Sequence, residues 1–141
     1  MGTLETSTET GIGIGTQTPE QALATLSDMT QNLVPIQPAE HLKRMAIAQG
    51  YMQAHNIAAI YLNAGTNLTY FTGMKWYASE RMVGAILPAK GAVQYIAPYF
   101  EIGSLNGFKV IDGPIHGWQE HENPYGLFVD VLRQLNIADT A

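Results

Sequence analysis

The sequence contains no cysteine and few cations, and each scarcity excludes a class of function. Without cysteine the chain has no disulfide, no thiolate nucleophile and no cysteine-based zinc site. Seven Lys and Arg against twelve Asp and Glu give a net charge of −5, without any basic run. This balance argues against nucleic acid and anionic membranes as partners. No apolar stretch approaches the length of a membrane span, and the N-terminus lacks a basic-then-apolar signal pattern. We therefore expect a cytoplasmic protein.

The length of the chain suits one ordinary domain. Residues 1–30 are rich in Thr, Gly, Ser and Gln and have few large apolar side chains, which predicts a flexible N-terminal extension. A short helix over residues 19–29, with Leu23 and Leu26 on one side, is the element expected there. Residues 31–141 are expected to form the folded domain.

Residues 38–55 predict the first firm helix of that domain. Glu40 lies in its first turn and can pair with Arg44 one turn further on, which also suits the helix dipole. His41 and His55 are expected on or near the polar side, where solvation is the default for histidine.

Four apolar runs predict strands. Residues 57–62 are nearly all apolar, as in a strand buried on both faces. Residues 82–87 and 93–96 are two further strands, and the loop between them has the length and chemistry of a hairpin. Residues 108–111 predict a fourth strand.

Short helices are expected between these strands. Residues 67–72 form one that Gly73 ends, residues 98–105 form another, and Asn123 caps a last amphipathic helix. Helices alternating with apolar strands, together with one hairpin, predict an α/β domain of three layers. Its sheet is mixed and is covered by helices on both faces.

One polar loop, residues 115–122, gathers potential metal ligands. His116, Glu120, His121 and Glu122 are residue types that bind zinc or manganese. The run does not match the HExxH motif, so we favour the simpler interpretation of a polar loop before a helix. The sequence also lacks a Gly-x-Ser-x-Gly elbow and a Walker-type phosphate loop. No metal site and no catalytic residue are therefore predicted in this chain.

Residues 74–81 combine large aromatic and charged side chains between two apolar elements, where a scaffold commonly presents function. The planar guanidinium of Arg81 suits a substrate carboxylate. The structural alternative for Arg81 is a salt bridge to Glu80, to Glu101 or to a neighbouring chain. Trp76 is either an exposed anchor for a partner protein or part of the core.

Several segments together resemble the N-terminal domain of the creatinase/prolidase family of metallopeptidases. The most specific piece is the NLTYFTG run at residues 67–73, followed by the Glu80-Arg81 pair. The other matching segments are residues 40–45, 57–62, 98–101 and 118–124. The resemblance extends over about residues 36–138 and is closest to the bacterial Xaa-Pro dipeptidase and aminopeptidase branch.

This resemblance implies a ribonuclease-H-like fold of the creatinase N-terminal type. In the family, a C-terminal "pita-bread" domain follows and binds two divalent metals (Mn, Co or Zn) through Asp, Asp, His, Glu and Glu. That domain is absent from this sequence, so we expect this chain to be non-catalytic. The expected partners are its own C-terminal catalytic domain, a second subunit in a homodimer, and a peptide substrate.

The resemblance also implies roles for two side chains in the partner subunit's pocket. Arg81 lies as far beyond Gly73 as the arginine that grips the substrate carboxylate in creatinase lies beyond its own glycine. Ser79 stands where creatinase has a phenylalanine that packs on its substrate, which favours a peptide over creatine. Trp76 lies on the same loop, and the resemblance implies that it lines a proline pocket across the dimer, as an aromatic residue of this domain does in related aminopeptidases.

The function implied is dimer assembly and shaping of the partner's substrate pocket in a Xaa-Pro dipeptidase or aminopeptidase. Three alternatives stay open. These are the N-terminal domain of a creatinase-type amidinohydrolase, a stand-alone protein-interaction module, and a self-contained metal hydrolase using residues 115–122.

Overall fold

A computed structural model describes residues 15–137 of the chain. The chain divides into two units, residues 1–35 and residues 36–141. The second unit contains α2 (Pro38–Ala54), β1 (Ala59–Asn63), α3 (Thr66–Thr72), β2 (Gly84–Pro88), β3 (Gln94–Pro98), the 3-10 helix η1 (Tyr99–Glu101), α4 (Ile102–Phe108), β4 (Ile115–Trp118) and α5 (Pro124–Gln134).

The described part of the first unit, residues 15–35, contains one short helix, α1 (Pro19–Ala24). Thr18 and Gln21 form a capping box, in which each side chain accepts the backbone N–H of the other residue. The helix is shorter than the one predicted for residues 19–29, and it buries none of its residues. Its stability therefore rests on local capping and not on a core.

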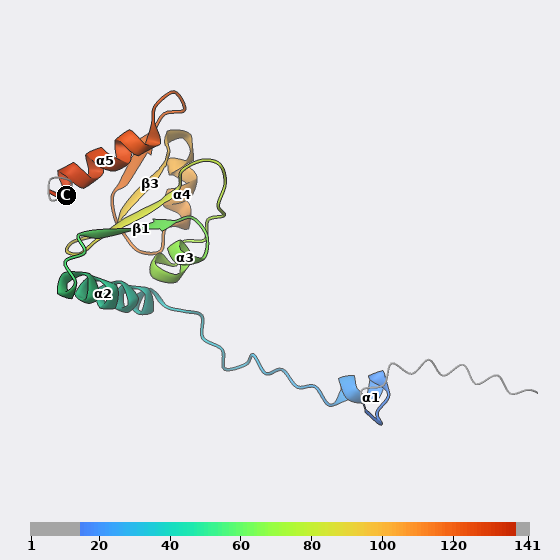
Figure 1. The fold of residues 1–141 in the computed structure, drawn as a ribbon. Coiled ribbons are helices and arrows are strands. Elements are labelled where there is room, and N and C mark those ends of the chain that lie inside the picture. The colour runs from blue at the N-terminus through green and yellow to red at the C-terminus, as the bar shows by residue number, and fades with distance from the viewer. Residues whose placement is uncertain (1–14, 138–141) are drawn as a thin grey trace, which may run out of the picture. The chain divides into compact units, whose positions relative to one another are not determined.

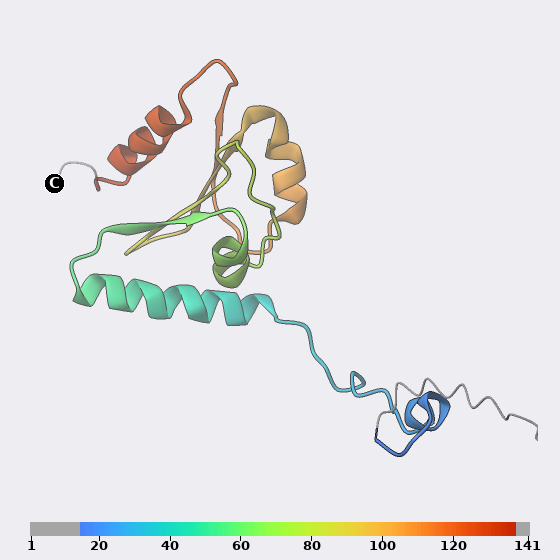
Figure 2. The same cartoon turned by 45° about the vertical axis from the view of Figure 1, so that its right-hand side comes forward.

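The second unit is built on a four-stranded sheet in the order β1-β2-β3-β4. The β1–β2 and β2–β3 pairs are antiparallel, and the β3–β4 pair is parallel. The mixed sheet and the β2–β3 hairpin were predicted from the sequence and are confirmed. Figures 1 and 2 show α2 and α3 on one side of the sheet and α5 on the other.

The two central strands bury both of their faces. Ala85 and Leu87 of β2 join the larger core cluster with α2, α3 and α4, whereas Ile86 between them packs with α5. In β3, Tyr95 faces the larger cluster and Ile96 faces α5 in the same alternation. The side-chain period of two thus divides the apolar residues between two cores, and helices must cover both faces.

The prediction of a strand at residues 108–111 is wrong. Phe108 ends α4, and the fourth strand is Ile115–Trp118, inside the predicted polar loop. β4 is an edge strand whose Ile115 and His116 are half-buried, so it lacks the continuous apolar run that marks a central strand. Its identity comes from parallel pairing with β3, in the register Tyr95↔Ile115.

Two further expectations need correction. His41 is not solvated on a polar side: it is buried, and its Nδ1 lies 2.9 Å from the backbone oxygen of Tyr70. β1 is not buried on both faces, because it is an edge strand whose residues are mostly half-buried. In contrast, the Glu40–Arg44 pair forms at 3.1 Å, and Gly73 ends α3 with a left-handed φ of 75°.

Gly84 and Gly50 give a matched test of the packing at the β1–β2 pair. A Cβ on Gly84 would overlap the backbone oxygen of Leu62, whereas a Cβ on Gly50 in α2 meets nothing within 4 Å. Gly84→Ala should lower the free energy of unfolding by about 3 kcal/mol, because the two strands must move apart. Gly50→Ala should raise it by about 0.5–1 kcal/mol, because glycine is a poor residue for a helix interior.

Urea unfolding followed by circular dichroism measures both changes. A Gly84→Ala variant as stable as the unmodified chain would show that the approach of β1 to β2 is looser than described.

Candidate functional site

The candidate site is the loop of residues 73–83, which connects α3 to β2. Met74 and Val83, near its two ends, are almost completely buried. The backbone oxygen of Trp76 accepts a hydrogen bond of 2.8 Å from the N–H of Gly65, which ties the loop to the start of α3. The middle of the loop is exposed. A segment held at both ends in this way presents its central side chains to solvent in a defined position.

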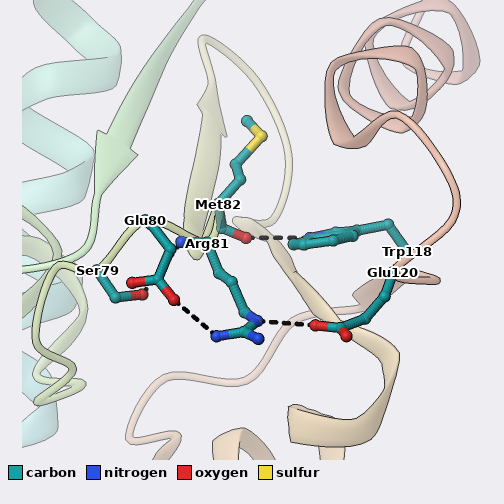
Figure 3. A network of polar contacts seen from close by, with 6 residues as sticks. All are labelled: Ser79, Glu80, Arg81, Met82, Trp118 and Glu120. Atoms are coloured by element: carbon teal, nitrogen blue, oxygen red, sulfur yellow. Dashed lines mark hydrogen bonds and ion pairs between the residues drawn. The ribbon is translucent and has the colours of Figure 1, made fainter.

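Arg81 is the centre of the polar network in this loop (Figure 3). Its Nε donates to Glu120 at 2.8 Å, and its Nη1 donates to Glu80 at 2.8 Å. The guanidinium carbon lies 5.6 Å from the ring centroid of Phe100, in a cation–π contact. The hydrogen bond that Arg81 donates to Glu120 is the main cause that raises the pKa of Arg81, so the side chain remains cationic. The salt bridge to Glu80 that the sequence suggested is therefore present.

The network orients Arg81 without burying it. The side chain of Arg81 is 39% exposed, and that of its partner Glu120 is 57% exposed. Exposed ion pairs of this kind contribute little to folding stability, because water already solvates both charges. Their effect is to hold the planar guanidinium at the surface in one orientation.

Trp118 fixes the position of Glu120 relative to Arg81. Its Nε1 donates to the backbone oxygen of Met82 at 3.1 Å (Figure 3), and its buried ring packs with residues of α5. This hydrogen bond attaches β4 to Met82, the residue that follows Arg81. Because Glu120 comes only two residues after Trp118, it is held close to the arginine. The sequence did not predict this pairing, because it depends on tertiary contact between segments far apart in the chain.

Trp76 and Arg81, the two predicted site residues, line different cavities. Arg81 lines a cavity of about 660 Å³ together with Tyr61, Glu120 and Tyr125. Trp76 lines a cavity of about 500 Å³ beside α3. Trp76 also packs against the main core, and its ring meets Phe108 edge-to-face at 6.1 Å. The core interpretation of Trp76 therefore holds for the part of the ring that meets Phe108, whereas a role as an anchor for a partner protein stays a prediction.

Three of the four potential metal ligands of residues 115–122, namely His116, Glu120 and Glu122, are engaged with other groups. His116 Nε2 lies 3.0 Å from Gln94 Oε1, and burial lowers the pKa of His116. Glu120 accepts a hydrogen bond from Arg81, and Glu122 accepts one of 2.8 Å from the backbone N–H of Gln119. Within residues 15–137 no three His, Asp or Glu side chains form a group that could hold an ion. The donors that are described do not fit a metal site.

Tyr61 is a feature of the Arg81 cavity that the sequence did not reveal. Its hydroxyl is buried and, alone among the buried side-chain polar atoms of the described residues, has no hydrogen-bond partner. Burial, and secondarily Tyr125, raises the pKa of Tyr61 to about 12. The neutral phenol is therefore the stable form at this position over the physiological pH range.

Comparison with known proteins identifies the class to which this fold and loop belong. Residues 44–138 match the family described as "Creatinase/Prolidase N-terminal domain". A probable dipeptidase PepE of Mycobacterium tuberculosis is 28% identical over 99 residues, which are 65% of this chain and 25% of that protein. The chain thus spans about a quarter of the length of the curated relatives that it matches.

Solved structures share the fold. Dipeptidase PepE from Mycobacterium ulcerans has a TM-score of 0.62 at 23% identity, over 71% of this chain and 28% of that one. The N-terminal domain of Xaa-Pro dipeptidase from Lactobacillus brevis has a TM-score of 0.59 at 22% identity, over 66% of this chain and 69% of that one. The chain belongs to the creatinase/prolidase N-terminal domain family. Among residues 15–137, no helix is both long enough and apolar enough to span a bilayer.

Two buried tyrosines test the hydrogen-bond assignment at this site. Tyr61 has no partner for its hydroxyl, whereas the hydroxyl of Tyr95 donates to the backbone oxygen of Ile111 at 2.8 Å. Tyr61→Phe should raise the free energy of unfolding by about 1 kcal/mol, because it removes an unsatisfied polar group. Tyr95→Phe should lower it by about 1–2 kcal/mol, because it leaves the carbonyl of Ile111 unpaired.

Urea unfolding at pH 7 measures both variants, and equal effects would contradict the assignment. The same measurement at high pH gives a second check. Burial raises the pKa of Tyr61 from about 10 to about 12, so its protonated form contributes stability below pH 10 that is lost as the pH rises through 12. Tyr61→Phe should therefore reduce the fall in stability between pH 10 and pH 12.

Proposed function

We propose that this chain is the non-catalytic N-terminal domain of a metal-dependent Xaa-Pro dipeptidase or aminopeptidase of the cytoplasm. In this proposal it assembles the homodimer and shapes the substrate pocket of the partner subunit. The observation that carries the proposal is the family match over residues 44–138, together with the likeness to N-terminal domains of dipeptidases. The relatives that match at the sequence level are probable dipeptidases, which favours a peptidase over an amidinohydrolase.

The surface around Arg81 supports a role at a subunit interface. Phe100 is 60% exposed and Tyr125 is 68% exposed. Phe100 contacts Arg81, and Tyr125 lines the same cavity. Exposed aromatic residues beside an arginine are typical of interface cores, where covering them removes apolar surface from water.

The geometry of Arg81 suits a carboxylate that arrives from outside the chain. Glu80 and Glu120 hold the guanidinium in place while it remains partly exposed. A substrate carboxylate would take over donors that these glutamates now occupy, in a planar two-point contact. Since Trp76 and Arg81 line different cavities, a neighbouring subunit would have to lie across both to use both.

Catalysis in the proposed parent belongs to its C-terminal domain. Two divalent metal ions (Mn, Co or Zn) held there would activate water and polarise the scissile carbonyl. In this proposal, the residues of this chain do not coordinate the metal ions. Their part is to bind and orient the peptide.

The isolated chain should not hydrolyse peptides. With added Mn²⁺ or Co²⁺ and a proline-containing dipeptide, turnover should equal that of a blank. Creatine tested beside the dipeptide on the full-length parent separates a dipeptidase from an amidinohydrolase. Turnover by the isolated chain that persists through further purification would overturn the non-catalytic assignment.

Mixed dimers of the full-length parent test whether Arg81 acts across the subunit interface. One subunit carries Arg81→Gln, and the other carries a substitution that inactivates its metal site. If Arg81 acts in trans, the mixed dimer has one complete site, because the Arg81→Gln subunit receives its arginine from the partner. Random assembly should then restore about a quarter of the unmodified activity, since about half of the dimers are mixed.

An arginine that acts within its own subunit gives no recovery in this experiment. Lys90→Gln, which changes an exposed cation in the β2–β3 turn, is the matched control. It should leave the KM for the dipeptide unchanged, whereas Arg81→Gln should raise it. Unchanged KM in both variants would contradict the substrate role of Arg81.

A further inference from the structure

We propose that the cavity beside Trp76 is a binding site for a small apolar carboxylate, a molecule with one aromatic or branched side chain and one carboxylate group. The cavity has a volume of about 500 Å³, within the range of ligand sites in proteins. Tyr70 of α3 and the consecutive residues Lys75, Trp76 and Tyr77 are among its lining residues. The inference concerns this chain alone and does not rest on the proposed dipeptidase role.

The walls of this cavity are held in place without a ligand. The N–H of Gly65 donates to the backbone oxygen of Trp76 at 2.8 Å, and Thr69 Oγ1 donates to the backbone oxygen of Met74 at 3.0 Å. These two bonds join α3 to the loop that follows it. The edge-to-face contact with Phe108 fixes the indole ring from the core side. Binding therefore requires little reorganisation, which lowers its entropic cost.

The lining is mostly apolar, includes three aromatic residues, and is open to solvent. Tyr77 is 93% exposed and Tyr70 is 50% exposed, and both line the cavity with Trp76. Covering this surface with an apolar side chain removes nonpolar area from water on both molecules. The cavity thus selects a ligand with a compact apolar body.

The charges on the lining favour a single negative group on that ligand. Two cations, Arg44 and Lys75, line the cavity. Arg44 is already neutralised by Glu40 at 3.1 Å and lies 4.3 Å from the ring centroid of Tyr70. Lys75 has no ion-pair partner within residues 15–137. One uncompensated ammonium suits a carboxylate, whereas phosphate sites commonly gather several donors.

The experiment uses the complete 141-residue chain, labelled with ¹⁵N, and two probes that differ only in charge. These probes are N-acetylphenylalanine and N-acetylphenylalaninamide. The acid should bind with a Kd on the order of 1 mM, shifting the Trp76 indole signal and the Gly65 amide signal. The amide should bind roughly threefold more weakly, because it lacks the ion pair with Lys75.

Three variants separate charge from apolar contact. Lys75→Gln should remove the difference between the two probes, whereas Lys90→Gln, a change at an exposed lysine outside the cavity lining, should preserve it. Tyr77→Ala should weaken both probes equally. Because Tyr77 is almost fully exposed, this last variant is expected to fold normally, as its unchanged far-UV circular dichroism would show.

A short peptide that ends in phenylalanine identifies the source of the carboxylate. Tighter binding than N-acetylphenylalanine supports the site and points to a polypeptide C-terminus, whereas equal or weaker binding supports the site and points to a free acid. The proposal is overturned if neither probe gives saturable shifts, if acid and amide bind equally to the unmodified chain, or if the shifts centre on Trp118. None of these results bears on the mixed-dimer experiment, which reports on Arg81.

Discussion

The structure depends on the double burial of β2 and β3. Ile86 and Ile96 project toward α5, while their neighbours along the same strands project toward α2, α3 and α4. Leaving either face uncovered would expose aliphatic side chains, and burial of each one contributes about 2–3 kcal/mol to the free energy of unfolding. Helices are therefore required on both sides of the sheet. The order of elements along the chain then decides which helix covers which face.

The candidate site follows from this arrangement. The chain leaves α3 at Gly73 and must return to the sheet as β2, so residues 74–83 cross the end of the sheet as an anchored loop. The parallel pairing of β4 with β3 requires a crossover, which η1 and α4 supply. That crossover brings Glu120 beside Arg81. A polar network of residues far apart in sequence is thus a product of sheet topology.

Local chemistry explains which features could be predicted. The end of α3 at Gly73 and the cap of α5 by Asn123 each depend on residues within one turn, and the structure contains both. The ion pair between Glu40 and Arg44 is local in the same sense. The family resemblance added the creatinase N-terminal type of fold and the roles proposed for Trp76 and Arg81, whose positions in separate cavities only the structure revealed.

Longer-range contacts explain what was missed. The helix pattern predicts His41 on the polar side, because nothing in the helix itself indicates that α3 packs over the imidazole. The sequence predicts a loop where β4 lies, because an edge strand with polar and small residues has no distinctive local pattern. The unpaired hydroxyl of Tyr61 depends on the approach of β1 to β2 at Gly84. Each of these features is set by a neighbour that is distant in the chain.

Taken by itself, the sequence determined the end of α3, the start of α5, the hairpin, the mixed α/β class and the absence of thiol chemistry. Helix caps, turns and apolar runs act over a few residues, and composition needs no fold at all. Only the tertiary structure decided that Arg81 is held between Glu80 and Glu120 and that Trp76 lines a separate cavity. It also decided that residues 115–118 form a strand. Those outcomes depend on which strands pair and in what register. The pairing and register are set by the simultaneous packing of the two core clusters, one on each face of the sheet.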